Sequence, residues 1–405
     1  MKLEKCWRWF GNADTTSLTD LKQMGVEGVV TALNKFKPGE VWTLESIKAT
    51  KDLIEQHGMR WSVVESLPVS EEIKKGSSKA AKHINNYIQS LHNLAQCGID
   101  RVCYNFMPVI DWVRTDLAYM DEDGTETMMF DPVIFAVFDI FILQRVNAKD
   151  DYSPEMLKLA EARIQNDGMT EEEKKKLSYN LIVITQGFIN SGVATGDNYL
   201  KDFKRALASY RTLGEDNFRN NFSHFLKEVI PVAQNLNIKM AVHPDDPPFS
   251  ILGLPRIAST LQDFEWIFEQ EPSPANGMTF CTGSLGVRAD NDLSLILDKL
   301  GDRIHFAHLR NLKHLDGGRF FESGHIDGDI DMVMVVTKLL KEQIRRKAEG
   351  DNGWRIPMRP DHGKKMLDDF GRSSNPGYPT IGRFRGISEI RGMEEAINAY
   401  LKKGN

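Results

Sequence analysis

Short apolar segments alternate with longer amphipathic segments along most of the chain. Eight of the short segments have the length, the β-branched content and the flanking turn residues of buried strands. They cover residues 5–10, 28–33, 60–65, 100–106, 239–243, 278–282, 304–309 and 355–360. Apolar residues between them recur every three or four positions, which predicts helices that bury one face. Eight strands that each precede a helix favour a closed parallel (β/α)8 TIM barrel over an open doubly wound sheet.

The predicted helices carry start and stop signals. Ser17, followed three residues later by Asp20, forms a capping-box pattern at the start of a helix over residues 18–24. Gly58 and Gly98 follow apolar repeats and predict the ends of two further helices. Other helices are predicted over residues 43–57, 78–96, 222–235, 261–269, 293–300, 330–347 and 387–401.

The alternation stops between residues 109 and 200. A turn is predicted at 121–124, but no segment there has the alternating faces of a strand. Helical periodicity follows, including the charged run 171–176, which is typical of a solvated helix face. We therefore expect a single domain over residues 1–405, with a helical insertion at 109–200 after the fourth strand. Its expected role is a lid or a dimer contact, and a homodimer or higher homo-oligomer is predicted.

Composition narrows the functional class. The chain has 405 residues, of which 41% are hydrophobic, enough for a sizeable core. A net charge of −6 argues against a nucleic-acid-binding surface. The longest apolar run, 133–143, is too short to cross a membrane, and the N-terminus lacks the apolar core of a signal peptide. Four cysteines are too few for a disulfide framework, and no G-x-G-x-x-G motif predicts a nucleotide cofactor. A reduced, cytoplasmic enzyme with a small polar substrate is expected.

Titratable side chains stand at the ends of the last four predicted strands. They are His243, Cys281, His308 and Asp361. Because barrel active sites lie at the C-terminal ends of the strands, all four can reach one point. Two imidazoles, a thiolate and a carboxylate suit a divalent transition metal. Taken singly, a strand cysteine is more often a small buried hydrophobe, and a histidine is more often a hydrogen-bonded structural residue. Their occurrence on four consecutive strands favours the metal site.

Arginines and one asparagine accompany these residues. Arg310 lies two positions after His308 and is expected on the same side, where its guanidinium could hold a substrate carboxylate. Arg359 stands two residues before the aspartate of the last strand, and Arg8 and Asn105 lie in the first and fourth strands. All four are candidate substrate-binding residues. The alternative for each arginine is a salt bridge at the barrel rim.

Further candidates lie in loops. His362 and Tyr378 follow the last strand, and both side chains can transfer protons, although a loop tyrosine is more often a packing residue. His325 is a candidate substrate-binding residue just before a predicted helix, and Asp329 could be the N-cap of that helix.

The neighbouring positions of Asp361 and His362 impose a geometric condition. Consecutive strand residues point to opposite faces. Both side chains can therefore face one site only if the strand ends at Asp361 and the chain turns at Gly363.

Seven motifs together resemble the mannonate dehydratase family, of the xylose-isomerase-like barrel group. They are W-R-W-F-G at 7–11, G-V-V-T-A-L at 28–33, H-P-D-D-P-P at 243–248, C-T-G-S at 281–284, H-L-R-N at 308–311, H-I-D-G-D-I-D-M at 325–332 and R-P-D-H-G at 359–363. The resemblance implies a lyase that dehydrates D-mannonate to 2-dehydro-3-deoxy-D-gluconate in hexuronate (glucuronate) breakdown, with Mn²⁺ or Fe²⁺. It implies that the metal ligands are His243, Cys281, His308 and Asp361. It places His362 and Tyr378 at positions that the family associates with proton transfer or substrate contact.

Such a dehydration removes a proton from the carbon beside the carboxylate and expels hydroxide from the next carbon. We expect Tyr378 and His362 to divide the acid and base roles, in an order that the sequence leaves open. Asp361 is expected on the metal, where a carboxylate is a poorer base. One alternative is a sugar or sugar-acid isomerase or epimerase on the same metal-dependent barrel. Another is a non-catalytic metal-binding or sugar-binding barrel, which the ionisable residues at the strand ends disfavour.

Overall fold

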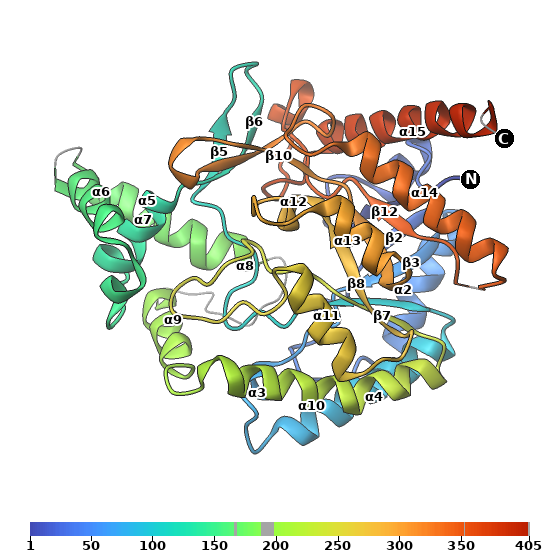
Figure 1. The fold of residues 1–405 in the computed structure, drawn as a ribbon, viewed down its shortest axis with the longest axis horizontal. Coiled ribbons are helices and arrows are strands. Elements are labelled where there is room, and N and C mark those ends of the chain that lie inside the picture. The colour runs from blue at the N-terminus through green and yellow to red at the C-terminus, as the bar shows by residue number, and fades with distance from the viewer. Residues whose placement is uncertain (166–167, 188–197, 352, 404–405) are drawn as a thin grey trace.

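Eight parallel strands close into a barrel in the computed structural model, which describes residues 1–165, 168–187, 198–351 and 353–403 (Figure 1). The order around the barrel is β1-β12-β9-β8-β7-β4-β3-β2. The bounds are β1 Glu4–Arg8, β2 Gly28–Thr31, β3 Arg60–Glu65, β4 Arg101–Tyr104, β7 Lys239–Val242, β8 Asn276–Cys281, β9 Ile304–His308 and β12 Pro357–Arg359. Each predicted strand is present within two residues of its expected ends, and the predicted TIM barrel is confirmed.

Helices cover the outside of the barrel. They include α1 Leu18–Gln23, α2 Leu44–Gln56, α4 Ala80–Gln96, α10 Gly214–Asn235, α11 Leu261–Gln270, α13 Leu293–Leu300, α14 Met332–Ala348 and α15 Thr380–Lys403. The capping box of Ser17 and Asp20 is confirmed at α1. Gly58 and Gly98, just after α2 and α4, have φ of +70°, a conformation that glycine adopts without strain. Within the described residues, none of the helices combines the length and the apolar character that crossing a bilayer would require.

The segment between β4 and α10 is only partly helical. Its α-helices are α5 Pro132–Val137, α6 Pro154–Gln165, α7 Glu171–Tyr179, α8 Thr185–Gly187 and α9 Tyr199–Ala208. Figure 1 shows α5, α6, α7 and α9 grouped to one side of the barrel. The helical prediction was wrong for residues 116–130, which form the strands β5 Asp116–Met120 and β6 Glu126–Phe130 around the predicted turn. Residues 166–167 and 188–197 of the predicted insertion lie outside the described residues.

The hairpin of β5 and β6 belongs to a second sheet. Its antiparallel order is β10-β11-β6-β5, where β10 is Asn311–His314 and β11 is Phe320–Ser323. The strand pattern is weak in sequence because β5 is largely solvent-accessible on both faces and its register is irregular. The remaining short helical turns are α3 Glu71–Lys74, α12 Thr282–Leu285, η1 Phe138–Ile142, η2 Ala148–Asp151, η3 Asn180–Ile184, η4 Gly301–Arg303, η5 Asp316–Gly318 and η6 Leu367–Gly371.

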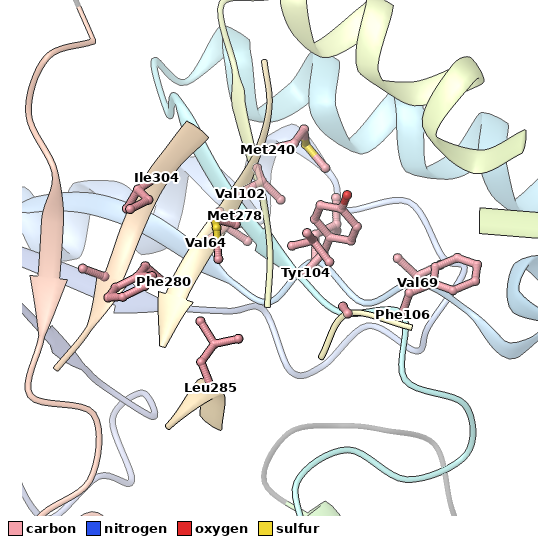
Figure 2. Packing of buried hydrophobic residues seen from close by; sticks show 14 of the residues in the cluster. Val64, Val69, Val102, Tyr104, Phe106, Met240, Met278, Phe280, Leu285 and Ile304 are labelled. Atoms are coloured by element: carbon pink, nitrogen blue, oxygen red, sulfur yellow. The ribbon is translucent and has the colours of Figure 1, made fainter. Parts of the chain in front are cut away.

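The strands of the barrel bury both faces. Their inward side chains form one cluster of Cys6, Val30, Val63, Cys103, Ala241 and Phe306. Outward side chains such as Val64, Val102 and Met278 pack in the larger core between strands and helices (Figure 2). In that core Phe106 stacks on Phe222 of α10, with 4.4 Å between ring centroids. Because side chains fill the barrel interior, the functional site lies above them, at the C-terminal ends of the strands.

Candidate metal centre and active site

Three of the predicted metal ligands form one cluster. His243 follows β7 directly, and Cys281 and His308 are the last residues of β8 and β9. These strands are neighbours in the barrel. The candidate ligand atoms of the three side chains all lie within 4.8 Å of one another. The shortest separation, 3.1 Å, joins His243 Nε2 and His308 Nδ1.

Asp361, two residues after the end of β12, lies beside this cluster. Its Oδ2 lies 3.8 Å from Cys281 Sγ, and its Oδ1 lies 3.8 Å from His308 Nδ1. The expected strand end at Asp361 was wrong, because β12 ends at Arg359. The expected turn at Gly363 was also wrong, because the left-handed residue is Asp361 itself, with φ of +67°. This conformation, strained for a non-glycine residue, lets Asp361 and His362 both line the same cavity.

His243, Cys281 and His308 are close enough to share a metal ion, and Asp361 lies beside them. Two atoms bound to one ion at about 2.0–2.3 Å can lie at most about 4.6 Å apart. The 3.1 Å separation of the two imidazoles satisfies that limit, and Asp361 meets it toward Cys281 and His308 through different carboxylate oxygens, at 3.8 Å each. His243 Nδ1 lies 2.7 Å from the Pro244 carbonyl oxygen, to which it donates, so Nε2 directs its lone pair into the cluster. His308 Nε2 accepts from Arg359 Nε at 3.1 Å and lies 3.4 Å from Glu65 Oε1. His243 Nε2 and His308 Nδ1, 3.1 Å apart, are close enough to share a proton or a cation.

The protonation of the ligands supports this interpretation. Burial lowers the pKa of His308 well below its usual value, which keeps that imidazole neutral. Burial also lowers the pKa of His243, but the hydrogen bond and charge of Cys281 outweigh it and raise the pKa to about 9. Burial raises the pKa of Asp361, but the charges of Arg359, His362 and Arg310 outweigh it and hold the pKa well below its usual range. A proton on His243 thus occupies the position for which a metal cation would compete.

Glu65 is a site residue that the sequence reasoning missed. It ends β3, and its carboxylate pairs with Arg359, with Oε2 2.9 Å from Nε and Oε1 2.8 Å from Nη2. Arg359 in turn donates through Nη1 to Asp361 Oδ1. Glu65 therefore fixes the arginine that holds a candidate metal ligand. Its position as a carboxylate at a strand end is the same signal that marked the four predicted ligands.

Arg310 is engaged by protein carboxylates. Its Nη2 lies 2.6 Å from Asp246 Oδ2, and its Nη1 lies 3.2 Å from Glu322 Oε1. Arg114 bridges the same two carboxylates, with Nη1 2.7 Å from Asp246 and Nε 3.1 Å from Glu322. All four side chains are buried. The guanidinium of Arg310 thus holds the carboxylates of Asp246 and Glu322 in place. Binding of a substrate carboxylate by Arg310 stays a prediction.

His362 and Tyr378 face each other beside this network. Their rings are T-shaped, with centroids 4.9 Å apart. His362 Nδ1 lies 2.7 Å from Glu322 Oε2, which can only accept, and 2.9 Å from Arg310 Nη1, which can only donate. Burial raises the pKa of Tyr378 to about 12, so its hydroxyl keeps its proton at neutral pH. The site thus places His362, which pairs with Glu322, next to the protonated hydroxyl-bearing ring of Tyr378.

One cavity with about 920 Å³ of empty space opens onto the candidate metal cluster. Among the predicted residues, Arg8, Asn105, Arg310, Arg359, His362 and Tyr378 line it. Arg8 is buried and donates to the Glu65 main-chain oxygen. In the described part of the chain, no carboxylate lies in ion-pair contact with its guanidinium. Arg8 therefore has the strongest geometric case for binding a substrate carboxylate.

His325 lies outside the cavity lining. Its Nε2 is 2.8 Å from the Pro360 carbonyl oxygen, which supports the chain just before Asp361. Its predicted substrate contact therefore has no support from the geometry. The suggestion that Asp329 is the N-cap of α14 was wrong, because Asp331 caps that helix through the main-chain NH of Met334. Asp329 instead accepts hydrogen bonds from His314.

The fold and the site are those of an enzyme built on a (β/α)8 barrel, with ionisable groups at the C-terminal ends of the strands. The family model described as D-mannonate dehydratase (UxuA) matches residues 1–404. The chain therefore belongs to the D-mannonate dehydratase family, which are hydro-lyases.

Similar proteins agree with this assignment. Mannonate dehydratases from Marinomonas sp. (strain MWYL1) and Chromohalobacter salexigens are each 46% identical to the chain, over 400 and 396 residues. These matches cover 98% of this chain and 100% and 99% of the two relatives. The crystal structure of mannonate dehydratase from Streptococcus suis serotype2 is 29% identical, with a TM-score of 0.75, and the match covers 99% of this chain and 95% of that one.

Proposed function

We propose that this protein removes water from D-mannonate to give 2-dehydro-3-deoxy-D-gluconate, with a divalent metal ion held by His243, Cys281, His308 and Asp361. The observation that carries the proposal is the convergence of these four side chains at one end of a cavity that also contains a histidine, a tyrosine and arginines. The family membership supports the substrate.

The reaction faces two barriers. The carbon beside a carboxylate is a weak acid because its conjugate base adds negative charge to an existing anion, and hydroxide is a poor leaving group. When bound, the metal supplies positive charge that stabilises this developing negative charge. Arg8 binds the substrate carboxylate in this proposal, because among the described residues its guanidinium donates to a main-chain oxygen and forms no ion pair. Arg359 and Arg310 hold Asp361 in place.

His362 is proposed as the base. In the proposed tautomer Nδ1 donates to Glu322, and Nε2 is the nitrogen that takes the proton from C2 of the substrate. Tyr378 is proposed as the acid, because a phenol with a pKa of about 12 is protonated at neutral pH. It donates to the C3 hydroxyl, and the C3–O bond breaks with release of water while the C2–C3 double bond forms. The enol then takes a proton at C3 as it loses its hydroxyl proton, and the proton on His362 returns to Tyr378.

The direct test is incubation with D-mannonate and Mn²⁺ or Fe²⁺, with and without a chelator, followed by an assay for the 2-keto-3-deoxy acid. The proposal requires product formation that the chelator abolishes and that added metal restores. Conversion of D-mannonate without loss of water would indicate the isomerase or epimerase alternative. Absence of any metal-dependent conversion would overturn the proposal.

The proposal includes the setting of the reaction. Mn²⁺ or Fe²⁺ is proposed as the native metal, and metal analysis of protein purified without added metal tests this choice. A place in hexuronate breakdown follows from the proposed substrate and product. A cytoplasmic location is supported by the four cysteines, which are all free. A homo-oligomer, with residues 109–200 as a lid or dimer contact, stays a prediction that light scattering can test.

A further inference from the structure

The cavity has a second polar region that the proposed chemistry leaves unused. Besides the residues used in the proposed chemistry it is lined by Glu71, Lys74, Asn105 and Asp111, together with apolar side chains such as Met107 and Val109. The reaction engages only C1, C2 and C3 of the substrate. The rest of a six-carbon sugar acid, with hydroxyls on C4, C5 and C6, must occupy cavity volume away from the reacting carbons.

Two of these polar residues already satisfy each other. Lys74 Nζ donates to Glu71 Oε1 at 2.9 Å and to the Met107 carbonyl oxygen at 2.7 Å. The other carboxylate oxygen, Glu71 Oε2, accepts from the Tyr210 hydroxyl at 2.6 Å and from the Val109 main-chain NH at 3.3 Å. This pair therefore has little remaining capacity for a substrate hydroxyl.

Asp111 carries fewer hydrogen bonds than this pair. Its Oδ2 accepts from Asn105 Nδ2 at 2.5 Å, and its carboxylate also accepts from the main-chain NH of Trp112. A carboxylate offers about four acceptor positions and is a strong acceptor for hydroxyl donors. Asp111, which lines the cavity, therefore keeps acceptor capacity for a substrate hydroxyl.

The main chain around Asp111 is held in place from several sides. Gln186 Oε1 accepts from its NH at 2.9 Å, and Arg256 Nη2 donates to its carbonyl oxygen at 3.0 Å. Two residues earlier, Val109 has φ of +62°, an outlier for a β-branched residue. Surrounding contacts must stabilise such a conformation, and strain of this kind gathers at ligand sites. The carboxylate is thus positioned before a ligand arrives.

We infer that Asp111, positioned by Asn105, accepts a hydrogen bond from a hydroxyl of the C4–C6 part of the sugar acid and determines specificity for that part of the substrate. The inference rests on the proposed function. It assigns Asp111 no role in proton transfer, so the loss of its carboxylate affects substrates only through the hydroxyl that it binds.

The test combines enzyme variants with deoxy substrates. The ratio kcat/KM is measured for D-mannonate and for its 4-, 5- and 6-deoxy analogues, with wild-type protein and Asp111→Ala. In the wild type, removal of the bound hydroxyl should lower kcat/KM by about 10- to 100-fold, the worth of a hydrogen bond to a charged group. In Asp111→Ala the same removal should have almost no effect, and the variant should bind metal normally. Asp111→Asn preserves the shape of the side chain and supplies the answer if the alanine variant fails to fold.

A matched control is Asp216→Asn, an exposed aspartate of α10 outside the cavity lining. It should show the wild-type response to all three analogues. A merely structural role for Asp111 would lower kcat/KM equally for all substrates, and that outcome, or an unchanged deoxy effect in both Asp111 variants, would overturn the inference alone. If the wild type does not convert D-mannonate, the proposed function and this inference both fail.

Discussion

Glu322 is the residue whose neutralisation tests the site geometry most sharply. Its carboxylate lies 2.9 Å from Arg114, 3.2 Å from Arg310 and 2.7 Å from His362, all within the protein interior. The substitution Glu322→Gln keeps the shape of the side chain but removes the negative charge. Arg114 and Arg310 then share Asp246 as a counter-charge, and Arg310 also keeps its ion pair with Asp361.

The magnitude follows from these contacts. Neutralising one partner of a buried ion pair costs about 3–5 kcal/mol. For 405 residues, at about 2.1 cal/mol/K per residue, the entropy of unfolding is about 0.85 kcal/mol/K. The melting temperature should therefore fall by about 4–6 °C. The imidazole of His362 loses the acceptor that fixes its orientation, and a misplaced catalytic group lowers kcat by about 100-fold.

Calorimetry and the keto-acid assay measure the two effects at equal metal content. Glu342→Gln is the matched control, because Glu342 also accepts from two arginines, Arg345 and Arg346, but lies on α14 away from the cavity. It should leave kcat unchanged. A Glu322→Gln protein with Tm within about 1 °C and kcat within about twofold of the wild type would refute the assignment of Glu322 as the group that orients His362.

Three further results are expected. Cys281→Ser should lose bound metal, measured by elemental analysis, and lose turnover while keeping its circular dichroism spectrum; full activity of the metal-depleted variant would contradict the ligand assignment. Tyr378→Phe should keep the metal but lower kcat by about 10²- to 10⁴-fold, the usual worth of a general acid, and an unchanged kcat would exclude that role. Because burial raises the pKa of Tyr378 to about 12, its contribution to folding is complete below about pH 10 and is lost as the pH rises toward 12. Melting temperatures between pH 8 and pH 11.5 should therefore fall less steeply in Tyr378→Phe than in the wild type.

The barrel could be predicted from the sequence because each of its strands is buried on both faces and therefore appears as a continuous apolar segment. The sequence also marked the candidate metal ligands, whose role stays a prediction, since a titratable side chain at the end of such a segment contrasts with the apolar residues before it. Glu65 gave the same signal at the end of β3 and was overlooked. Cys281 shows why the pattern mattered: alone it is indistinguishable from Cys6 or Cys103, which are buried hydrophobes inside the barrel.

The rest could not be predicted because it depends on contacts between distant segments. Glu322 lies on β11, a strand whose partner β6 belongs to the insertion, and no local periodicity marks either strand clearly. The left-handed backbone of Asp361 is likewise invisible in a sequence that offers Gly363 two residues later as the obvious turn residue. Gly363 has a different constraint, since an added Cβ would lie 2.6 Å from the main chain of Arg383.

The four-stranded sheet has a consequence for the order of folding. Arg114 and Glu322, which meet beside it, are 208 residues apart in the chain. Because closing so long a loop costs entropy before any contact is gained, we expect the local hairpins β5–β6 and β10–β11 to form before β6 pairs with β11. A folding chain then passes through a species in which both hairpins are present but Arg114 and Glu322 have not yet met. Recovery of turnover during refolding should consequently lag behind recovery of secondary structure.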